Sequence, residues 1–182
     1  MNQPGSPLPE IKAGLARLLD EDGYDREWFK PSDWTLRIKI LLAEIGFTRD
    51  YSVWASGLND IDESPARKVN QEWLYDLVWI NYEGRGPTRT LRSIPLAAES
   101  EMGPWPEVID DFEKLIIANA DIKIMLFHSN DVARAESMCD DLQKRVQEFE
   151  GQWIRSEYLL GCIAWKDGIF VFRQFTSPER KG

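Results

Sequence analysis

Three carboxylates of the chain have the spacing of a divalent-metal site. Asp76 interrupts the aromatic and β-branched run 72–80, which otherwise has the composition of a buried strand. Glu99 and Glu101 end a second run that begins at residue 91, and their i, i+2 spacing places both side chains on one face of an extended strand. Carboxylates at the ends of neighbouring apolar strands are costly to bury unless a cation neutralises them, and such hard oxygen ligands suit Mg²⁺ or Mn²⁺. We therefore expect these three residues to bind one of these ions.

One cation follows the carboxylates on the next expected element. After Gly103 an apolar stripe at helical spacing predicts a helix, with a proline early in its first turn, where the missing N–H does no harm. Lys114 leaves this helix on a flank beside the stripe, so its ammonium group can reach the carboxylates if the helix packs on the sheet. Nearby negative charges favour the ionised form of a lysine, and we expect Lys114 to stabilise charge rather than to accept a proton.

Hydrolysis of a phosphodiester bond is the chemistry that such a site supports. A divalent ion lowers the pKa of a bound water and stabilises the charge that builds on a scissile phosphate. The same residues also have a structural interpretation, with Asp76 as a hydrogen-bonding residue at a strand end and Glu99 and Glu101 as a solvated face. Lys114 and Glu101 would then form an ordinary salt bridge, and the acidic surface with its tryptophans would bind a protein partner.

Apolar spacing also predicts the elements that surround these residues. The expected helices cover residues 9–22, 34–46 and 131–151; the expected further strands cover 51–55, 122–127, 158–165 and 169–175, with a polar link at 56–70. A strand that follows a helix predicts a parallel crossover in an α/β sheet. We expect a single α/β domain at residues 10–176, between flexible tails at 1–9 and 177–182.

These motifs and this order of elements resemble a known group of enzymes. Asp76 followed by Glu99-Ser100-Glu101 is similar to the motif of the PD-(D/E)XK nuclease-like superfamily, which has an Asp in one core strand and (Asp/Glu)-x-Lys on the next. The expected elements between residues 34 and 175 are similar to the αβββαβ core of that superfamily, preceded here by an extra N-terminal helix. The resemblance implies a restriction-endonuclease-like α/β fold, in which helices flank a mixed central sheet, and a metal-dependent nuclease.

The chain departs from the superfamily motif at two positions. Glu101 stands where the motif has lysine, and no proline directly precedes Asp76. Because the superfamily includes members with glutamate at that position and members whose lysine has moved to the following helix, the resemblance assigns the role of the lysine to Lys114. It also implies an accessory carboxylate on the helix before the first core strand, where Glu44 is the nearest match. The alternative is an inactive protein of this fold that binds a protein partner, as an antitoxin, an immunity protein or a complex subunit would.

The negative net charge of the chain limits how it can bind nucleic acid. Binding to phosphates depends on locally concentrated cations, which a formal net charge of -9 opposes. Arg85, Arg89 and Arg92 supply one such concentration, on and just after the turn that joins the two acidic strands. We expect these arginines to contact nucleic acid, with DNA favoured over RNA. A solvated hairpin tip is the alternative.

Composition excludes several other classes of protein. No apolar run approaches the length that spans a bilayer, and the first residues lack the pattern of a secretory signal. A single histidine, His128, leaves little for zinc binding or Ser-His catalysis. Cys139 and Cys162 lie in apolar stripes and are expected to be buried, reduced thiols, which favours a cytoplasmic protein without a membrane partner. A homodimer and a protein partner both stay open.

Overall fold

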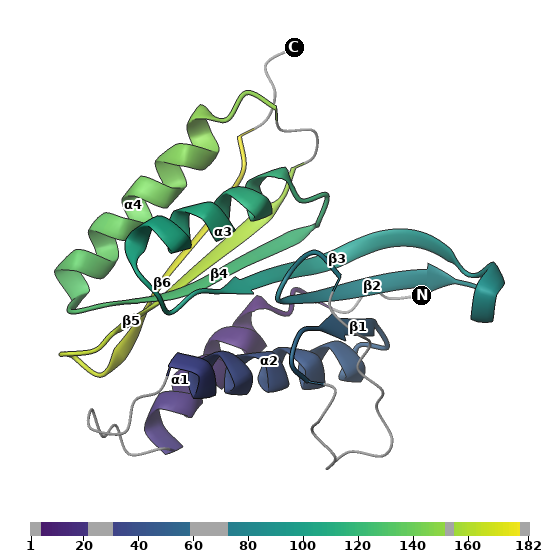
Figure 1. The fold of residues 1–182 in the computed structure, drawn as a ribbon, viewed down its shortest axis with the longest axis horizontal. Helices are drawn as coiled ribbons and strands as arrows, with labels where there is room; N and C mark the ends of the chain where they lie inside the picture. Colours follow the sequence, from purple (N-terminus) through teal and green to yellow (C-terminus); the bar gives the residue numbers. More distant parts are fainter. Residues whose placement is uncertain (1–4, 22–30, 59–72, 152–154, 179–182) are drawn as a thin grey trace.

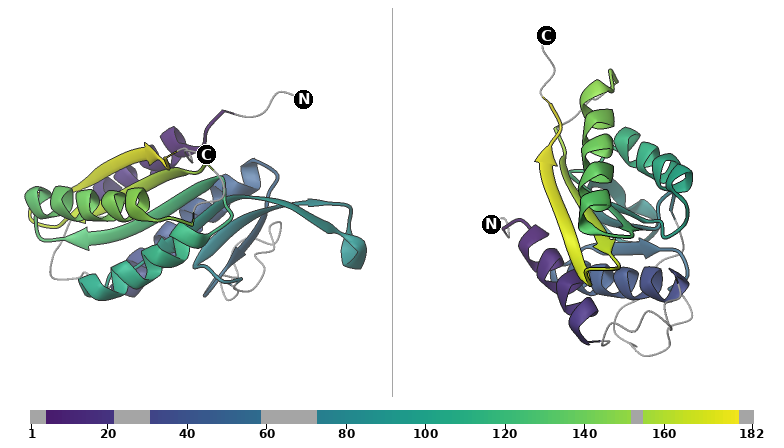
Figure 2. Two further views of the ribbon diagram at one scale, coloured as in Figure 1. Left: turned by 90° about the horizontal axis from the view of Figure 1, so that it is seen from above. Right: turned by 90° about the vertical axis from the view of Figure 1, so that its left-hand side faces the viewer.

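The structure, a computed structural model, describes residues 5–21, 31–58, 73–151 and 155–178. The elements, in chain order, are α1 (Leu8–Glu21), α2 (Pro31–Thr48), β1 (Ser52–Ala55), β2 (Leu77–Glu83), the short helix η2 (Gly86–Thr88), β3 (Thr90–Ser100), α3 (Trp105–Ile117), β4 (Ile122–Ser129), α4 (Val132–Glu148), β5 (Glu157–Ala164) and β6 (Ile169–Thr176). Figures 1 and 2 show the sheet between two helical layers, α3 with α4 on one face and α1 with α2 on the other.

A single mixed sheet organises these elements. Its six strands lie in the order β1-β2-β3-β4-β5-β6. The first three strands form an antiparallel meander, α3 and α4 then connect the parallel strands β3, β4 and β5, and β6 returns antiparallel to β5. The prediction of an α/β fold with a mixed central sheet flanked by helices is confirmed.

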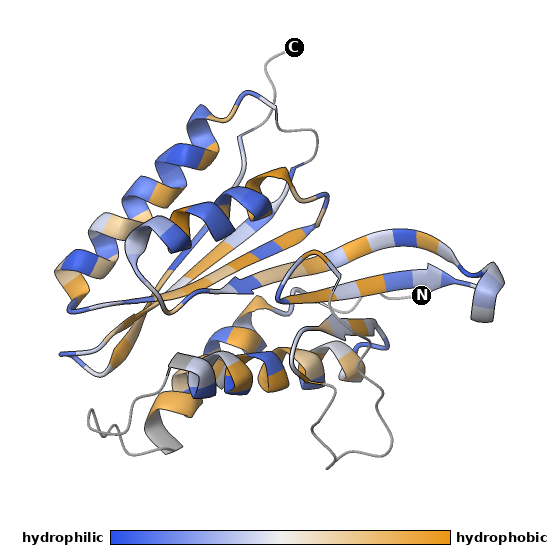
Figure 3. Ribbon diagram, in the orientation of Figure 1, coloured by the Kyte–Doolittle hydropathy of each residue, from blue (hydrophilic) through white to orange (hydrophobic). Residues whose placement is uncertain are grey.

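Alternating side chains on the central strands divide the hydrophobic core into two parts. In β2, Val78 and Ile80 face the core beneath α3 and α4, whereas Leu77 and Trp79 face the core beneath α1 and α2. The central strands are therefore buried on both faces, which explains their continuous apolar runs. In Figure 3 the hydrophobic colour is concentrated on these strands and on the helix faces turned toward them. The predicted stripe of α3 is buried as expected, through Val108, Phe112, Leu115 and Ile116.

The first helix begins earlier than its sequence pattern predicts. α1 starts at Leu8, so residues 8 and 9 belong to this helix rather than to the expected tail, and the side chain of Leu8 is fully buried in the core. The predicted end of this helix at residues 22 and 23 lies outside the described residues, as does the polar link from residue 59 to residue 70.

The second helix ends later than predicted. α2 continues to Thr48, so the prediction that it ends at Gly46 is wrong. A Cβ at Gly46 would come within 2.5 Å of Trp79 Nε1, and this nitrogen donates a hydrogen bond to Leu42 O at 3.0 Å. Glycine at this position therefore serves the close approach of the helix to the sheet, not the end of the helix.

The strand expected at residues 72–80 is formed only in its second half. β2 begins at Leu77, so Asp76 directly precedes the strand instead of interrupting it. Leu74 has a φ of 71°, a left-handed conformation that is unfavourable for a bulky residue, and the chain turns there before the strand begins. Trp73 and Tyr75 on either side of Leu74 form an isolated bridge and pack against the core.

Beyond Ile80 the paired strands β2 and β3 extend away from the sheet. β1 pairs with β2 only as far as Ile80, and β4 pairs with β3 only from Leu96 onward. Residues 81–93, which we call the arm, pair only with one another within the part of the chain that the structure describes. Figures 1 and 2 show the arm protruding from one side of the molecule, with η2 at its tip.

Two predictions from composition can be compared with the structure. Within the described ranges, no helix is long and apolar enough to cross a membrane. Cys139 and Cys162 are buried and free, as expected, and burial raises the pKa of both thiols to about 12.

Gly46→Ala tests the packing of α2 on the sheet. Alanine is the better helix former by about 1 kcal/mol. Its methyl group would, however, collide with Trp79, which is fully buried and held by its hydrogen bond to Leu42. Because overpacking a core costs about 1–3 kcal/mol, we expect a net loss of roughly 1 kcal/mol in the free energy of unfolding, measured by urea denaturation.

Gly14→Ala in α1 is the matched control. A Cβ at Gly14 would meet only the end of Leu41, a partly buried side chain that can change its rotamer. We expect a free energy of unfolding equal to or above that of the wild type. An equal loss in both variants would contradict the packing role assigned to Gly46.

Candidate functional site

The antiparallel register of β2 and β3 brings two of the predicted carboxylates together. Leu77 pairs with Ala98, so the residue before β2 lies beside the end of β3. The backbone N–H of Asp76 donates to Glu99 Oε2 at 3.2 Å, and the backbone N–H of Ser100 donates to Asp76 Oδ2 at 3.0 Å. The structure therefore places Asp76 and Glu99 side by side at the junction of the two strands.

A lysine from α2 neutralises Asp76. Lys39 Nζ lies 2.7 Å from Asp76 Oδ1, and the ammonium group is also held by Ser56, 2.6 Å from its Oγ and 3.3 Å from its carbonyl oxygen. Ser56 Oγ donates to the same Asp76 oxygen at 3.2 Å. Lys39 is only 8% exposed and the side chain of Asp76 is 25% exposed, so the ion pair is partly buried, and both oxygens of the Asp76 carboxylate have partners.

Glu99 is the less well compensated carboxylate. It is 3% exposed, and its Oε1 is buried without a hydrogen-bond partner. The nearest cation is Lys114, whose Nζ lies 3.9 Å from this oxygen. Burial, followed by the negative charge of Asp76, raises the pKa of Glu99 to about 8. The side chain is therefore largely protonated at neutral pH in the absence of a further cation.

Lys114 reaches the site from α3, on the face of the sheet opposite α2. Its Nζ is held by Asp111 Oδ1 at 2.5 Å. This hydrogen bond, together with the charges of Glu99 and Asp76, raises the pKa of Lys114 and keeps it ionised. The predicted position of Lys114 beside the carboxylates agrees with the structure, although its partners are Asp111 and Glu99 rather than Glu101.

Glu101 is turned toward the loop before α3. Its Oε1 accepts a hydrogen bond from the backbone N–H of Gly103 at 2.5 Å. Its pKa is raised, first by burial and then by the charges of Asp111, Glu107 and Asp76. The charge of Glu101 therefore interacts with those of the neighbouring carboxylates, although its Oε1 already accepts the hydrogen bond from Gly103.

The donor set at this junction is suited to a hard divalent ion. Among the described residues, no group of three or more His, Cys, Asp or Glu side chains is arranged to hold a metal ion. Mg²⁺, however, is commonly bound through one or two carboxylates, with waters and substrate phosphates completing its octahedron. Asp76 and Glu99 are two carboxylates near enough for the charge of Asp76 to raise the pKa of Glu99, and the unpartnered Glu99 Oε1 is an oxygen that a cation would satisfy. The two carboxylates could hold Mg²⁺ or Mn²⁺ if the ammonium group of Lys39 moved away from Asp76 Oδ1.

Other residues with assigned roles lie outside this junction. Glu44 is exposed on α2 and lies about 140° around the helix from Lys39, given 3.6 residues per turn. α2 thus presents Lys39 to the site, not the accessory carboxylate that was expected. His128 lies at the end of β4, and its Nδ1 accepts a hydrogen bond from Trp165 Nε1 at 2.9 Å, which is a structural role.

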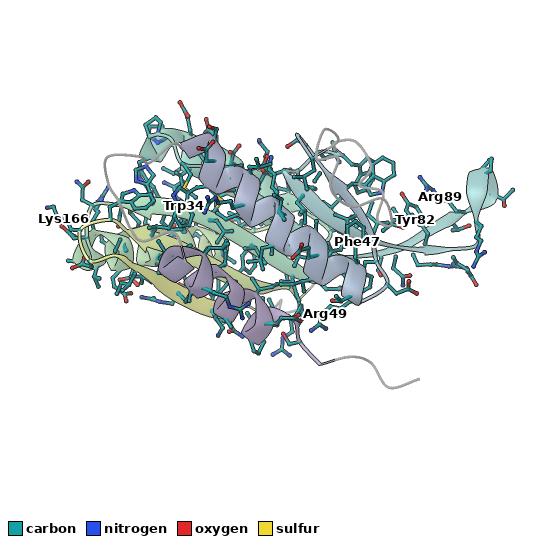
Figure 4. All side chains as sticks on the ribbon, turned by 90° about the horizontal axis from the view of Figure 1, so that it is seen from below. Trp34, Phe47, Arg49, Tyr82, Arg89 and Lys166 are labelled. Atoms are coloured by element: carbon teal, nitrogen blue, oxygen red, sulfur yellow. The ribbon has the colours of Figure 1, made fainter. Side chains whose placement is uncertain are left out.

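The three arginines lie on the arm, at the opposite end of β2 and β3 from the carboxylates. β2 has seven residues, so its far end, where the turn with Arg85 begins, lies about 23 Å from Asp76 at roughly 3.3 Å per residue. The guanidinium group of Arg89 stacks over Tyr82, 4.2 Å from the ring centroid, and Arg92 forms an ion pair with Glu83. Figure 4 shows Arg89 and Tyr82 together on the arm. The arginines therefore lie on the arm, apart from the carboxylates to which they are close in sequence.

Sequence reasoning missed several residues that build the site. Lys39 and Ser56 hold Asp76, Asp111 holds Lys114, and Thr35 Oγ1 hydrogen-bonds Ser100 Oγ at 3.3 Å. The signal for Lys39 is its place beside Ile38 and four residues before the buried Ala43, which puts a cation on the buried flank of the helix. No comparable signal exists for Ser56, because only the folded register brings it to Asp76.

Comparison with known proteins adds no assignment. No family model matches the chain, and the comparisons with curated proteins and with solved structures gave no match. The restriction-endonuclease-like core therefore stays a resemblance, carried by the acidic residues and by the order of elements.

Glu99→Gln tests the unfavourable burial of this carboxylate. In the folded chain Glu99 keeps its proton up to about pH 8, whereas in the unfolded chain it ionises near pH 4.5. The contribution of Glu99 to the free energy of unfolding of the wild type is therefore fully present below pH 4.5, and it is lost as the pH rises to 8. Glutamine does not titrate, so we expect the variant to gain stability over the wild type as pH rises from 4.5 to 8. The gain should reach the order of 3 kcal/mol, measured by urea denaturation across this range.

Glu148→Gln is the control for this pH series. Glu148 is exposed in the last turn of α4, where it pairs with Lys144. Glu148→Gln makes the same chemical change at an exposed position. We expect its free energy of unfolding to differ little from that of the wild type at every pH, because exposed ion pairs contribute little. A Glu99→Gln difference that did not vary with pH would contradict the unfavourable burial of the charged carboxylate.

Proposed function

We propose that this chain is a metal-dependent nuclease that hydrolyses phosphodiester bonds in nucleic acid. The observation that carries the proposal is the buried, unpartnered Oε1 of Glu99, which lies beside Asp76 and 3.9 Å from Lys114 Nζ. A buried carboxylate oxygen without a partner is rare in folded proteins, and it marks a place where a ligand supplies the missing interaction. Mg²⁺ or Mn²⁺ is the ligand that this donor set favours.

The order and direction of the strands support the same proposal. α2, β1, β2, β3, α3 and β4 follow one another with antiparallel, antiparallel and parallel pairing. Asp76 stands just before the second of these strands and Glu99 stands at the end of the third. This arrangement is similar to the αβββαβ core and the acidic positions of the PD-(D/E)XK superfamily, with Lys114 on the helix that follows the motif.

Each side chain has a role in the proposed hydrolysis. When bound, the ion would lower the pKa of a water and stabilise charge on the phosphate. Asp76 and Glu99 would hold the ion, and Glu99 would have to be ionised to do so. Lys114, fixed by Asp111, supplies positive charge to the phosphate as negative charge develops in the transition state. Glu101 is the accessory carboxylate through the oxygen that Gly103 does not use.

Lys39 controls access to Asp76 in this scheme. Its ammonium group occupies the Asp76 oxygen that the ion needs, and Ser56 offers two oxygens that can retain the lysine when it withdraws. The lysine thus balances the charge of Asp76 before the ion arrives.

The Lys39–Asp76 ion pair also favours a second candidate function. A partly buried carboxylate with every oxygen satisfied needs no metal, and such a pair serves structure alone. In this case the chain is an inactive protein of the same architecture that binds a protein partner. The two candidates differ in what a divalent ion does to the protein.

A nuclease assay tests the proposed activity directly. Purified protein is incubated with single- and double-stranded DNA and RNA, with Mg²⁺, with Mn²⁺ or with EDTA. We expect cleavage that requires the ion, and a loss of roughly 10²–10³-fold in Glu99→Ala, comparable to the loss of one group that stabilises the transition state. Asp141→Asn, a substitution at a partly exposed position on α4, should cleave like the wild type. Absence of ion-dependent cleavage of all four substrates by the wild type would exclude the nuclease.

Lys39→Met separates the two candidate functions. Removal of Lys39 leaves the partly buried Asp76 carboxylate without its cation, and we expect the free energy of unfolding to fall by about 2 kcal/mol without metal. Mg²⁺ or Mn²⁺ should restore most of this loss in the nuclease, because the variant lacks the competing ammonium group. At 100 times Kd the ion contributes about 2.7 kcal/mol.

Asp76→Asn provides the matched control for this measurement. The amide removes the charge that Lys39 and the ion share, so we expect no stabilisation by either metal. Thermal denaturation with and without metal measures all three proteins. If metal leaves the Tm of Lys39→Met unchanged, the site is structural and the interaction protein is favoured.

A further inference from the structure

The arm is a two-stranded ribbon, and no other described strand pairs with either of its edges. Its strands pair through Asn81 with Ser93, Tyr82 with Leu91 and Glu83 with Thr90. The register shifts at Asn81, and such irregularities bend a ribbon and increase its twist. Most side chains of the arm are exposed and polar, in contrast to the buried part of the same strands. Figure 3 shows this change of hydropathy along β2 and β3.

Contacts within the arm hold its cations in place. Arg89 stacks over Tyr82, and it also lies 5.5 Å from the ring centroid of Trp54 on β1, which ties the tip to the sheet. Arg92 pairs across the ribbon with Glu83, and both side chains are more than half exposed. Arg85 is exposed at the start of η2. The arm thus presents three guanidinium groups on a supported ribbon.

The charge of the arm is opposite to that of the chain. Residues 81–93 contain three arginines and one glutamate, a net charge of +2, whereas the whole chain has a net charge of -9. A local positive charge on an acidic protein attracts an anionic partner, and the negative charge of the remaining surface repels that partner. Among the larger apolar side chains of the arm only Leu91 is well exposed, at 44%, which is little for a protein interface.

We propose that the arm inserts into the major groove of double-stranded, B-form DNA, with Arg85, Arg89 and Arg92 on the phosphates that border the groove. The major groove is about 12 Å wide and admits a two-stranded β-ribbon. The corresponding groove of an RNA duplex is too deep and narrow for side chains to read. The substrate class is taken from the proposed nuclease function, on which this inference rests.

The length of the arm sets where it contacts the duplex. The far end of β2 lies about 23 Å from Asp76, which corresponds to roughly seven base pairs at about 3.4 Å each. The arm therefore holds duplex on one side of the phosphate at the carboxylates. A duplex that extends at least this far from the cleaved bond is the substrate that the geometry points to.

Equilibrium binding tests the arm without requiring cleavage. Glu99→Gln serves as the background protein, EDTA is present, and fluorescence anisotropy reports binding to a labelled 20-base-pair DNA duplex over a range of salt concentrations. We expect Arg85→Ala and Arg92→Ala each to weaken binding roughly tenfold. Each should also reduce the slope of log K against log salt by about 0.9, the value for one phosphate contact. Glu83→Gln removes the one anion of the arm and should tighten binding.

Lys166→Ala is the matched control. Lys166 is an exposed cation at the turn between β5 and β6, and Figure 4 shows it at the opposite end of the molecule from Arg89. The control changes the net charge by the same amount as the arm variants, and it should leave affinity and salt slope unchanged. Thermal denaturation of all variants checks that the exposed substitutions leave the fold intact.

Several results would overturn the inference. These are failure of the background protein to bind duplex DNA, equal losses in Lys166→Ala and the arm variants, and binding to single strands or to an RNA duplex that matches binding to duplex DNA. The outcome is distinct from that of the nuclease assay. If binding depends on the arm but the protein does not cleave, the nuclease proposal fails and the proposed role of the arm stands. If the protein cleaves but the arm variants bind as the background protein does, the nuclease proposal stands and the role of the arm fails.

Discussion

The presence of two carboxylates at one point of the sheet, Glu99 buried and Asp76 partly buried, is the constraint on which the rest of the site depends. Asp76 and Glu99 share the junction of β2 and β3, and water is largely absent from Glu99. Each negative charge there must be neutralised, protonated or hydrogen-bonded. The structure uses all three means, because Asp76 pairs with Lys39, Glu99 has a raised pKa, and backbone N–H groups donate to both carboxylates.

The layered architecture explains how two lysines reach the same pair of carboxylates. α2 and α3 cover opposite faces of the sheet, so Lys39 and Lys114 approach the junction from opposite sides. A crossover helix must follow β3 before the parallel strand β4, which fixes α3 beside the end of β3. The site is thus a product of topology as much as of local sequence.

The sequence predicts those parts of the structure that depend on local spacing. Apolar periodicity was sufficient for the α/β architecture and for the stripe of α3, and the single hairpin between Asp76 and Glu99 was sufficient to predict that they meet. The apolar stripe of α3 was sufficient to predict that Lys114 lies on the flank of the helix that faces the carboxylates. Patterns of this kind are encoded within a few turns or one strand pair.

Non-local contacts account for what could not be predicted. Lys39 and Ser56 meet Asp76 only after α2 packs on the sheet, and Gly46 is explained by a tryptophan more than thirty residues later. The arginines are close to the carboxylates in sequence, but the length of β2 separates the turn that carries them from Asp76. Glu101 was assigned by alternation alone, whereas the turn at Gly103 captured one of its oxygens.

The left-handed backbone at Leu74 has a consequence for how the site forms. An exposed leucine gains nothing locally from this conformation, so the packing of Trp73 and Tyr75 on either side must impose it. A peptide cut from this region would therefore relax, and its Asp76 would no longer be directed at Glu99. The carboxylate pair is in this sense a late product of folding, absent from the nascent chain until the strands that follow have been synthesised and have closed over those two rings.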